Sequence, residues 1–297
     1  MGILNRIWAI GLLLGIAGHS TSVMAEYQSE ISYKNIQTEY DDRSKLVYNE
    51  LLYKYHYNKV QDNTNPLAEA SYINRAGSMN IFFTRSTFED PVGPELDTDG
   101  LGFGFTKMEP DSPYVFELGY YNSETEVRMG VIFFGKTEDT YLTVGAGLFV
   151  YKHTLFNLKY VVHEVKYPGS GITENEYKLN DISVYFKTIL FGEDNDAINF
   201  EAIIGQKEYL DEERNVISNE YYKAYADYYI GRRISIGGGY EYETGKYEGA
   251  VGSNKIVRGR FFLTDSFSLS VEFEKRTRDY ELPSDSDSTE LKVNYRF

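Results

Sequence analysis

The chain has 297 residues, a formal net charge of −15 and no cysteine. This acidity argues against nucleic acid as a partner, because phosphate binding needs clusters of Lys and Arg. Without cysteine, an exported chain cannot use disulfides and must hold together by other means. The 28 tyrosines and 18 phenylalanines suit a protein whose rings lie at a boundary between lipid and water.

Residues 1–25 have the pattern of a secretory signal peptide. Arg6 supplies a positive start, residues 7–18 are apolar, and the segment ends in the small-residue cleavage site Val23-Met24-Ala25. The apolar run is too short to cross a bilayer as a helix, and no later stretch is long enough either. We therefore expect cleavage after Ala25, which leaves residues 26–297 as one domain, and we exclude a helical membrane protein.

Most of the remaining chain alternates between apolar and polar residues, which is the period of a β-strand with two different faces. None of the seven prolines interrupts an alternating segment, as expected where proline would remove a hydrogen bond from a sheet. In chain order, we predict strands near 27–37, 45–57, 77–87, 99–108, 113–122, 126–135, 139–150, 155–166, 178–190, 196–208, 217–230, 232–243, 254–264, 267–277 and 288–297.

The connections in the second half of the chain alternate in length. Short ones lie at 152–154, 191–195, 231–232 and 264–266, and long polar ones lie at 167–177, 209–216, 244–253 and 278–287. This alternation is typical of bacterial outer-membrane barrels, in which the number of strands is even. Because fifteen segments were found, we merge 113–122 with 126–135 and predict an all-β, antiparallel transmembrane barrel of 14 strands. A further strand at 66–73 would give 16, and more mergers would give 12.

The last strand ends in an aromatic residue, as outer-membrane barrels do. Apolar and polar side chains alternate up to Phe297, and we expect this strand to be the segment that the barrel-assembly machinery binds. The alternative, judged from this strand alone, is a half-buried strand of a soluble β-sandwich.

Charged residues fall on only one face of six predicted strands. We assign the apolar face to lipid and the charged face to a wet lumen, since a packed soluble core could not desolvate so many ions. The predicted wall has a basic part, formed by Lys187, Lys223, Arg233, Arg258 and Arg260, and an acidic part, formed by Glu201, Asp227, Glu241 and Glu272.

These inward charges have two interpretations. They can set a transverse field that selects solutes by charge and size, or they can simply pair inside a plugged lumen. Fourteen strands give a barrel roughly 28 Å across, which leaves on the order of 10–15 Å between side chains. We favour an open pore unless a loop folds in, and the acidic segment 88–98 is our candidate for such a loop.

Several segments resemble a known family. They are residues 26–30, residues 65–76 with the sequence Pro-Leu-Ala-Glu-Ala, and residues 197–202 and 233–240. Together they resemble the porin family of outer-membrane β-barrels in Gram-negative gamma-proteobacteria, over the whole length of the chain. The resemblance implies a passive diffusion channel, but it brings no substrate and no pore residues. The stretch 124–137 fits the family pattern least well.

The sequence offers few catalytic groups. Histidine is the usual general base, and after the signal peptide only His56, His153 and His163 remain. His163 beside Glu164 is the one place for a His–carboxylate pair, and no serine in a strained elbow motif accompanies it. The acidic runs in the loops are interpreted as solvated charge rather than as cation sites. We therefore expect no enzyme activity, no cofactor and no metal site.

The sequence thus predicts a porin of the bacterial outer membrane, through which small hydrophilic solutes diffuse passively. Its expected partners are outer-membrane lipid, lipopolysaccharide and those solutes. Two alternatives stay open, namely a structural or adhesive barrel with a filled lumen and an outer-membrane hydrolase that depends on His163. Neither a solute preference nor an oligomeric state is indicated.

Overall fold

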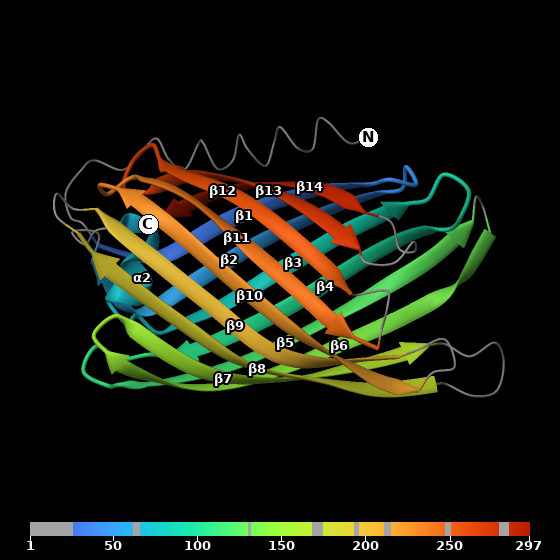
Figure 1. Ribbon diagram of the computed structural model, residues 1–297, viewed down its shortest axis with the longest axis horizontal. Coiled ribbons are helices and arrows are strands. Elements are labelled where there is room, and N and C mark those ends of the chain that lie inside the picture. Colours follow the sequence, from blue (N-terminus) through green and yellow to red (C-terminus); the bar gives the residue numbers. More distant parts are fainter. Residues whose placement is uncertain are drawn as a thin grey trace.

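The computed structural model is a closed barrel of 14 antiparallel strands (Figure 1). It describes residues 26–61, 66–129, 132–167, 175–192, 196–210, 215–246, 251–278 and 285–297. The predicted signal peptide, residues 1–25, lies outside the described residues. Each strand pairs with its neighbours in sequence, and pairing of the first strand with the last closes the barrel. A closed ladder satisfies the backbone without water, which is what a bilayer requires.

The strands form because the alternating segments give each one an apolar and a polar face. They are β1 (Glu26–Tyr40), β2 (Lys45–Gln61), β3 (Ser78–Glu89), β4 (Glu95–Lys107), β5 (Tyr114–Met129), β6 (Ile132–Tyr151), β7 (Thr154–Tyr167), β8 (Asn175–Phe191), β9 (Ala197–Leu210), β10 (Val216–Ile230), β11 (Ile234–Gly245), β12 (Gly252–Phe262), β13 (Phe267–Arg278) and β14 (Ser286–Arg296).

The predicted number of strands is confirmed, but the merger that produced it is wrong. Segment 126–135 is divided between β5 and β6, which form one long hairpin. Within this hairpin, Glu126 is directly opposite Lys136 and the two side chains form an ion pair of 3.3 Å. Such cross-strand pairs of opposite charge stabilise a sheet. They allow polar residues to form the ends of two strands, β5 and β6, where we expected one long strand.

The outer surface of the barrel is apolar. Ile236, Val257 and Phe273 lie on the apolar faces that the alternation assigns to lipid, and their side chains are more than half exposed, at 57%, 62% and 56%. Large apolar side chains exposed over a whole wall mark a membrane surface. The predicted outward face and the predicted outer-membrane type of barrel are thereby confirmed.

In the second half of the chain, the two ends of the barrel differ in the length of their connections. At the end where the C-terminus lies, the connections at 152–153 and 231–233 are very short. Short turns are typical of the periplasmic side, so we call this the periplasmic end. The long exception there is the connection between β2 and β3, residues 62–77.

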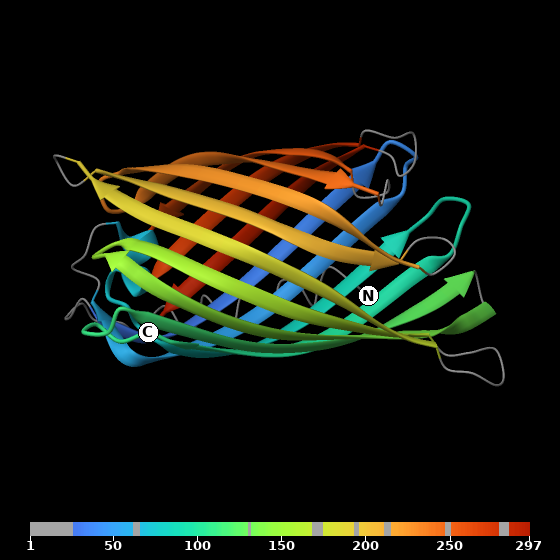
Figure 2. The ribbon, with the colours of Figure 1, turned by 60° about the horizontal axis from the view of Figure 1, so that its bottom comes forward.

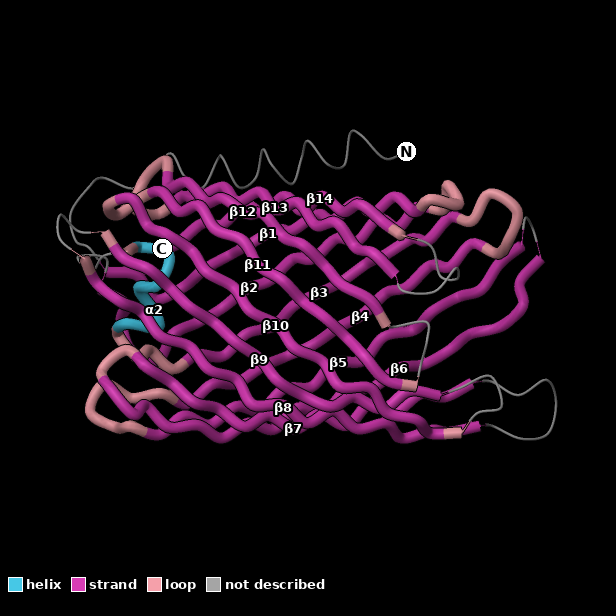
Figure 3. The backbone as a smooth tube through the Cα atoms, viewed as in Figure 1, coloured by secondary structure: helices cyan, strands magenta, loops and turns pink. Residues whose placement is uncertain are grey.

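The predicted sixteenth-strand segment, 66–73, is not a strand. It holds the short helices η1 (Leu67–Glu69) and α2 (Ala70–Ile73). Figures 2 and 3 show α2 inside the periplasmic end of the barrel, beside the C-terminus. Among the described residues, no helix is long and apolar enough to cross a membrane.

The buried apolar clusters lie where this connection meets the wall. One joins Ala70 and Ala76 of the connection to Tyr27 and Val60 of β1 and β2. Two others lie on the wall and pack against partly buried residues of the connection, Tyr72 among them. The barrel therefore has its packed core at the periplasmic mouth, while polar side chains line the lumen.

Candidate functional site

Residues 66–76, here called the plug segment, have a compact local structure. Pro66 precedes the first helical turn, where the missing proline N–H costs nothing. The second helix ends where Asn74 donates to the carbonyl of Ala70 from both its backbone (2.9 Å) and its side chain (2.7 Å). Arg75 then takes a positive φ of 48°, in the left-handed region that commonly ends helices.

One side of the plug segment is attached to β14 and to the β10–β11 hairpin. The N–H of Leu67 donates to the carbonyl of Arg232 (3.2 Å), and the guanidinium of Arg296 donates to the carbonyl of Leu67 (3.0 Å). The hydroxyl of Tyr229 donates to a carboxylate oxygen of Glu69 at 2.6 Å. Leu67, Glu69, Tyr229 and Arg296 are all buried, so water competes little for these bonds.

The other side of the plug segment is attached to the opposite wall. Arg75 donates to carbonyl groups of the β4–β5 and β6–β7 turns, that of Lys152 among them (3.1 Å), and its guanidinium lies 4.2 Å from the ring centre of Phe149. The hydroxyl of Tyr72 donates to the carbonyl of His153 at 3.2 Å. The plug segment therefore crosses the periplasmic mouth from one wall to the other.

The His153 side chain in this turn is neutral at pH 7. Burial lowers the pKa of His153, and the positive charges of Lys152 and Arg75 lower it further. A protonated imidazole at this place would repel the guanidinium that holds the plug segment to the turn.

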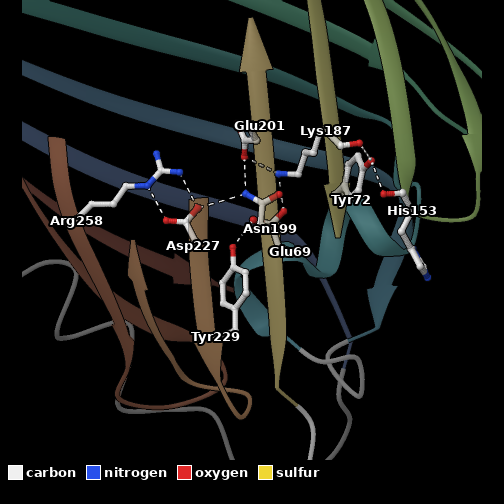
Figure 4. Close-up of polar contacts among 9 residues, drawn as sticks. All are labelled: Glu69, Tyr72, His153, Lys187, Asn199, Glu201, Asp227, Tyr229 and Arg258. Carbon is white, nitrogen blue, oxygen red and sulfur yellow. Dashed lines mark hydrogen bonds and ion pairs between the residues drawn. The ribbon is translucent and has the colours of Figure 1, made fainter. Parts of the chain in front are cut away.

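Lys187 joins the plug segment to the barrel wall (Figure 4). Its ammonium nitrogen lies 2.7 Å from Glu69 of the plug segment and 3.0 Å from Glu201 of β9. The same nitrogen lies 4.9 Å from the ring centre of Tyr72. A cation between two carboxylates and an aromatic face is well compensated for its burial.

The ion-pair network continues along the wall from Glu201. The side-chain amide of Asn199 donates to Glu201 (2.8 Å) and to Asp227 (3.2 Å). Arg258 then donates twice to the carboxylate of Asp227, at 2.7 and 2.6 Å, in the two-pronged geometry that guanidinium and carboxylate favour. Figure 4 shows this line of side chains running from the plug segment across β9 and β10 to β12.

A cavity of about 350 Å³ lies against the plug segment, with Ala68 and Glu69 among its lining residues. Lys223 and Glu241 pair with each other at 3.2 Å and line another part of the lumen. Six of the nine predicted wall residues line the first cavity: Lys187, Glu201, Asp227, Arg258, Arg260 and Glu272.

Arg233 is the predicted wall residue that the structure places elsewhere. It lies in the turn between β10 and β11, and its guanidinium pairs with Asp265 of the next periplasmic turn at 2.7 Å. Our predicted strand began at residue 232, whereas β11 begins at Ile234. Arg233 is therefore a rim residue and does not line the cavity.

The sequence prediction missed the plug segment as the part of the chain that enters the lumen. Our candidate, segment 88–98, is wrong, because most of it belongs to the β3–β4 hairpin with a turn at 90–94. One usable signal was length, since a long connection stood where a short periplasmic turn was expected. A second was the Pro-Leu-Ala-Glu-Ala sequence at 66–70, which we interpret from the sequence only as part of a family resemblance and of a possible extra strand.

His163 does pair with a carboxylate, but with a different one. Its Nε2 lies 2.7 Å from Asp139 of β6, and its ring stacks on Tyr141 with centres 4.0 Å apart. Glu164, the expected partner, pairs instead with Lys166 at 3.0 Å. Within the described ranges, no group of three or more His, Asp or Glu side chains is arranged to hold a metal ion.

Comparisons with known proteins agree with this architecture. No family model matches the sequence, and no curated protein matches it either. Among solved structures, the chain is similar to the outer membrane protein Omp33 of Acinetobacter baumannii, with 16% identity and a TM-score of 0.59 over 93% of this chain and 100% of that one.

Two further solved structures share the architecture. The CymD monoaromatic hydrocarbon channel has 8% identity and a TM-score of 0.54, covering 92% of this chain and 89% of that one. A FadL homologue of Pseudomonas aeruginosa has 9% identity and a TM-score of 0.53, covering 92% and 90%. At these identities the likeness shows the fold alone. The chain has the fold of bacterial outer-membrane β-barrels, as its resemblance to porins implied.

Proposed function

We propose that this protein is an outer-membrane channel through which small hydrophilic solutes diffuse passively. The observation that carries the proposal is the contrast between the two faces of one wall, with apolar side chains outside and charged side chains lining cavities inside. A charged interior needs water, and water in a barrel of this width provides a path for solutes.

The plug segment sets the limits of this path. Because it is bound to both sides of the periplasmic mouth, solutes have to pass beside it or displace part of it. We therefore expect a small conductance and a low size limit, rather than the opening of roughly 10–15 Å that fourteen strands alone would leave.

Single-channel recording in planar bilayers tests the proposal. The purified protein should give discrete current steps whose size grows with salt concentration. A protein that inserts into the bilayer and gives no step at any salt concentration would refute the channel. Insertion itself is checked by heat-modifiable mobility on a gel, which a folded barrel shows with or without conductance.

A second candidate is a structural or adhesive barrel with a filled lumen. The buried contacts of the plug segment favour it, since the charges of Lys187 and Glu69 pair with each other and hold the segment in place. This candidate predicts the same gel mobility and the same insertion without conductance. The recording therefore separates the two functions.

Partners outside the lumen remain part of the proposal. The side chain of Phe297 is 51% exposed, while its backbone pairs with Ser29 of β1 and so takes part in closing the barrel. Exposure of this ring supports recognition by the barrel-assembly machinery. Lipid and lipopolysaccharide would cover the apolar outer wall.

A further inference from the structure

Part of the cavity beside the plug segment is lined by positive charges that, among the described residues, no carboxylate contacts directly. Among the described residues, Lys292 makes no hydrogen bond and has no ion pair within 4 Å, and Arg260 makes only a hydrogen bond to the hydroxyl of Ser270 (3.0 Å). Lys292 interacts electrostatically with three cations, Arg260, Lys54 and Lys34, and with one carboxylate, Glu290, which it does not contact. In a chain of net charge −15, cations left without partners at one place are unexpected.

Two carboxylates in the same cavity also lack partners. Glu272 and Glu290 line it together with Lys292, and within the part of the chain that the structure describes neither one has a hydrogen bond or an ion pair within 4 Å. Arg258 lies directly opposite Glu272 in the strand register and interacts with it electrostatically, but its guanidinium is bound to Asp227.

The strand register puts like charges directly opposite each other twice. Glu272 of β13 is paired with Glu290 of β14, and Lys292 of β14 is paired with Lys34 of β1. Like charges opposite each other destabilise a sheet. Lys34 has one acidic partner, Glu50, at 3.6 Å. Exchanging the charges at positions 290 and 292 would give opposite-charge pairs at both places, so neutralising the wall does not explain the arrangement.

The spacing of these charges suits a solute that carries both signs. Positions 290 and 292 lie on the same face of β14, two residues or about 6.8 Å apart. A row of cations on the periplasmic side thus adjoins a row of carboxylates on the extracellular side. A simple anion would meet the carboxylates, and a simple cation would meet the lysine and arginine. Charges in a narrow lumen also interact more strongly than in bulk water.

We propose that this cavity binds small zwitterionic solutes of the α-amino acid type. Arg260 and Lys292 receive the carboxylate, and Glu272 and Glu290 receive the ammonium group. A cavity of about 350 Å³ accommodates a solute of this size. The proposal rests on the proposed function as a solute channel and names the class of solute that the lumen favours.

Saturation-transfer NMR on the purified protein in detergent tests this binding directly. The probes are glycine, acetate and methylammonium, because the last two each carry one of the two charges of glycine. We expect glycine to bind at least tenfold more tightly than either of the others. Equal binding of acetate and glycine would show a plain anion site, and no binding of glycine would show charges that are only solvated; both results overturn the proposal.

Matched variants identify the residues. Lys292→Met and Glu272→Gln should each weaken glycine binding at least fivefold, and Glu272→Gln should leave acetate binding unchanged or stronger. Lys159→Met is the control, since Lys159 is a lumen cation paired with Glu117 (3.1 Å) outside this cavity. Unchanged glycine binding in both site variants, with heat-modifiable mobility intact, would refute the assignment.

The outcome is separable from that of the proposed function. Binding in detergent does not require a current, so glycine binding without conductance would refute the channel and keep the site. Conductance in planar bilayers without tighter binding of glycine than of acetate and methylammonium would refute the site and keep the channel.

Discussion

Lys187 is the cation that joins the plug segment to the barrel wall through an ion pair. It contacts Glu69 of the plug segment and Glu201 of the wall, and it is only 9% exposed. A buried ion pair contributes little net stability, but removal of one partner leaves the other charge buried without compensation. Here, removal of the single cation would leave two carboxylates.

We therefore predict that Lys187→Met lowers the free energy of unfolding by roughly 3–5 kcal/mol, the usual cost of breaking a buried pair. Reversible unfolding by urea in lipid vesicles measures it. Lys159→Met is the matched control, because its pair with Glu117 is more exposed and should contribute under about 1 kcal/mol. Equal losses in the two variants would contradict the role given to Lys187.

A second residue-scale prediction concerns the glycines of β4. A Cβ at Gly102 would lie 2.1 Å from the ring of Phe82, and this ring is stacked on Tyr121 with centres 5.6 Å apart. Gly102→Ala should displace the ring and destabilise the barrel by about 1–3 kcal/mol, as overpacking does. At Gly259 the nearest atom to a Cβ is 3.6 Å away, so Gly259→Ala should be near neutral. The same urea titration compares the two.

At the scale of the element, each strand is defined by which face meets lipid. Ile236 and Ser235 are neighbours on β11, and they point to opposite sides, with Ile236 57% exposed on the outer wall and Ser235 lining the cavity. The alternation of the sequence was enough to assign both.

This assignment predicts opposite results for one substitution at two adjacent positions. Ile236→Arg places a charge in lipid and should cost about 2–4 kcal/mol if it lies near the bilayer centre. Ser235→Arg places the same charge in the lumen and should be tolerated. Folding yield into vesicles, read from heat-modifiable mobility, distinguishes them. Equal tolerance would mean that the faces are assigned wrongly.

The elements that could be predicted are those in which apolar and polar residues alternate with a regular period. Strands repeat every two residues, so their faces, and with them six wall residues of the cavity, followed from the pattern. Arg233 was misplaced because a strand boundary is not periodic, and an error of two residues at a strand end moves a side chain from lumen to turn.

The contacts that could not be predicted join segments far apart in the chain. Tyr229 and Glu69 are 160 positions apart, and Arg296 and Leu67 are 229 apart. No local pattern encodes such contacts. Likewise, His163 meets Asp139 across the β6–β7 register rather than its own neighbour in sequence, because adjacent residues of a strand point to opposite faces.

At the scale of the whole molecule, the barrel combines a lipid-facing wall, a charged lumen and a plug segment that crosses one mouth. The wall closes without an edge through the pairing of β1 with β14, so it does not need the plug segment in order to form a complete ladder. The plug segment is bound mainly by side chains and turn carbonyls. It can therefore be weakened while the wall stays intact.

The account predicts that weakening the plug segment raises permeation. In the double variant Arg75→Gln, Tyr72→Phe, the segment loses its bonds to the β4–β5 and β6–β7 turns, while its attachment to Arg296 remains. A second variant replaces residues 66–76 with a Gly-Ser connection of the same length. Gel mobility confirms that each variant folds.

Liposome swelling in a small neutral sugar tests the central claim most directly, since it measures the passage of a hydrophilic solute through the lumen. We predict slow swelling with the wild-type protein, above that of protein-free liposomes, and swelling several-fold faster with both variants. Liposomes that swell at the protein-free rate with the wild type and with both folded variants would contradict the account.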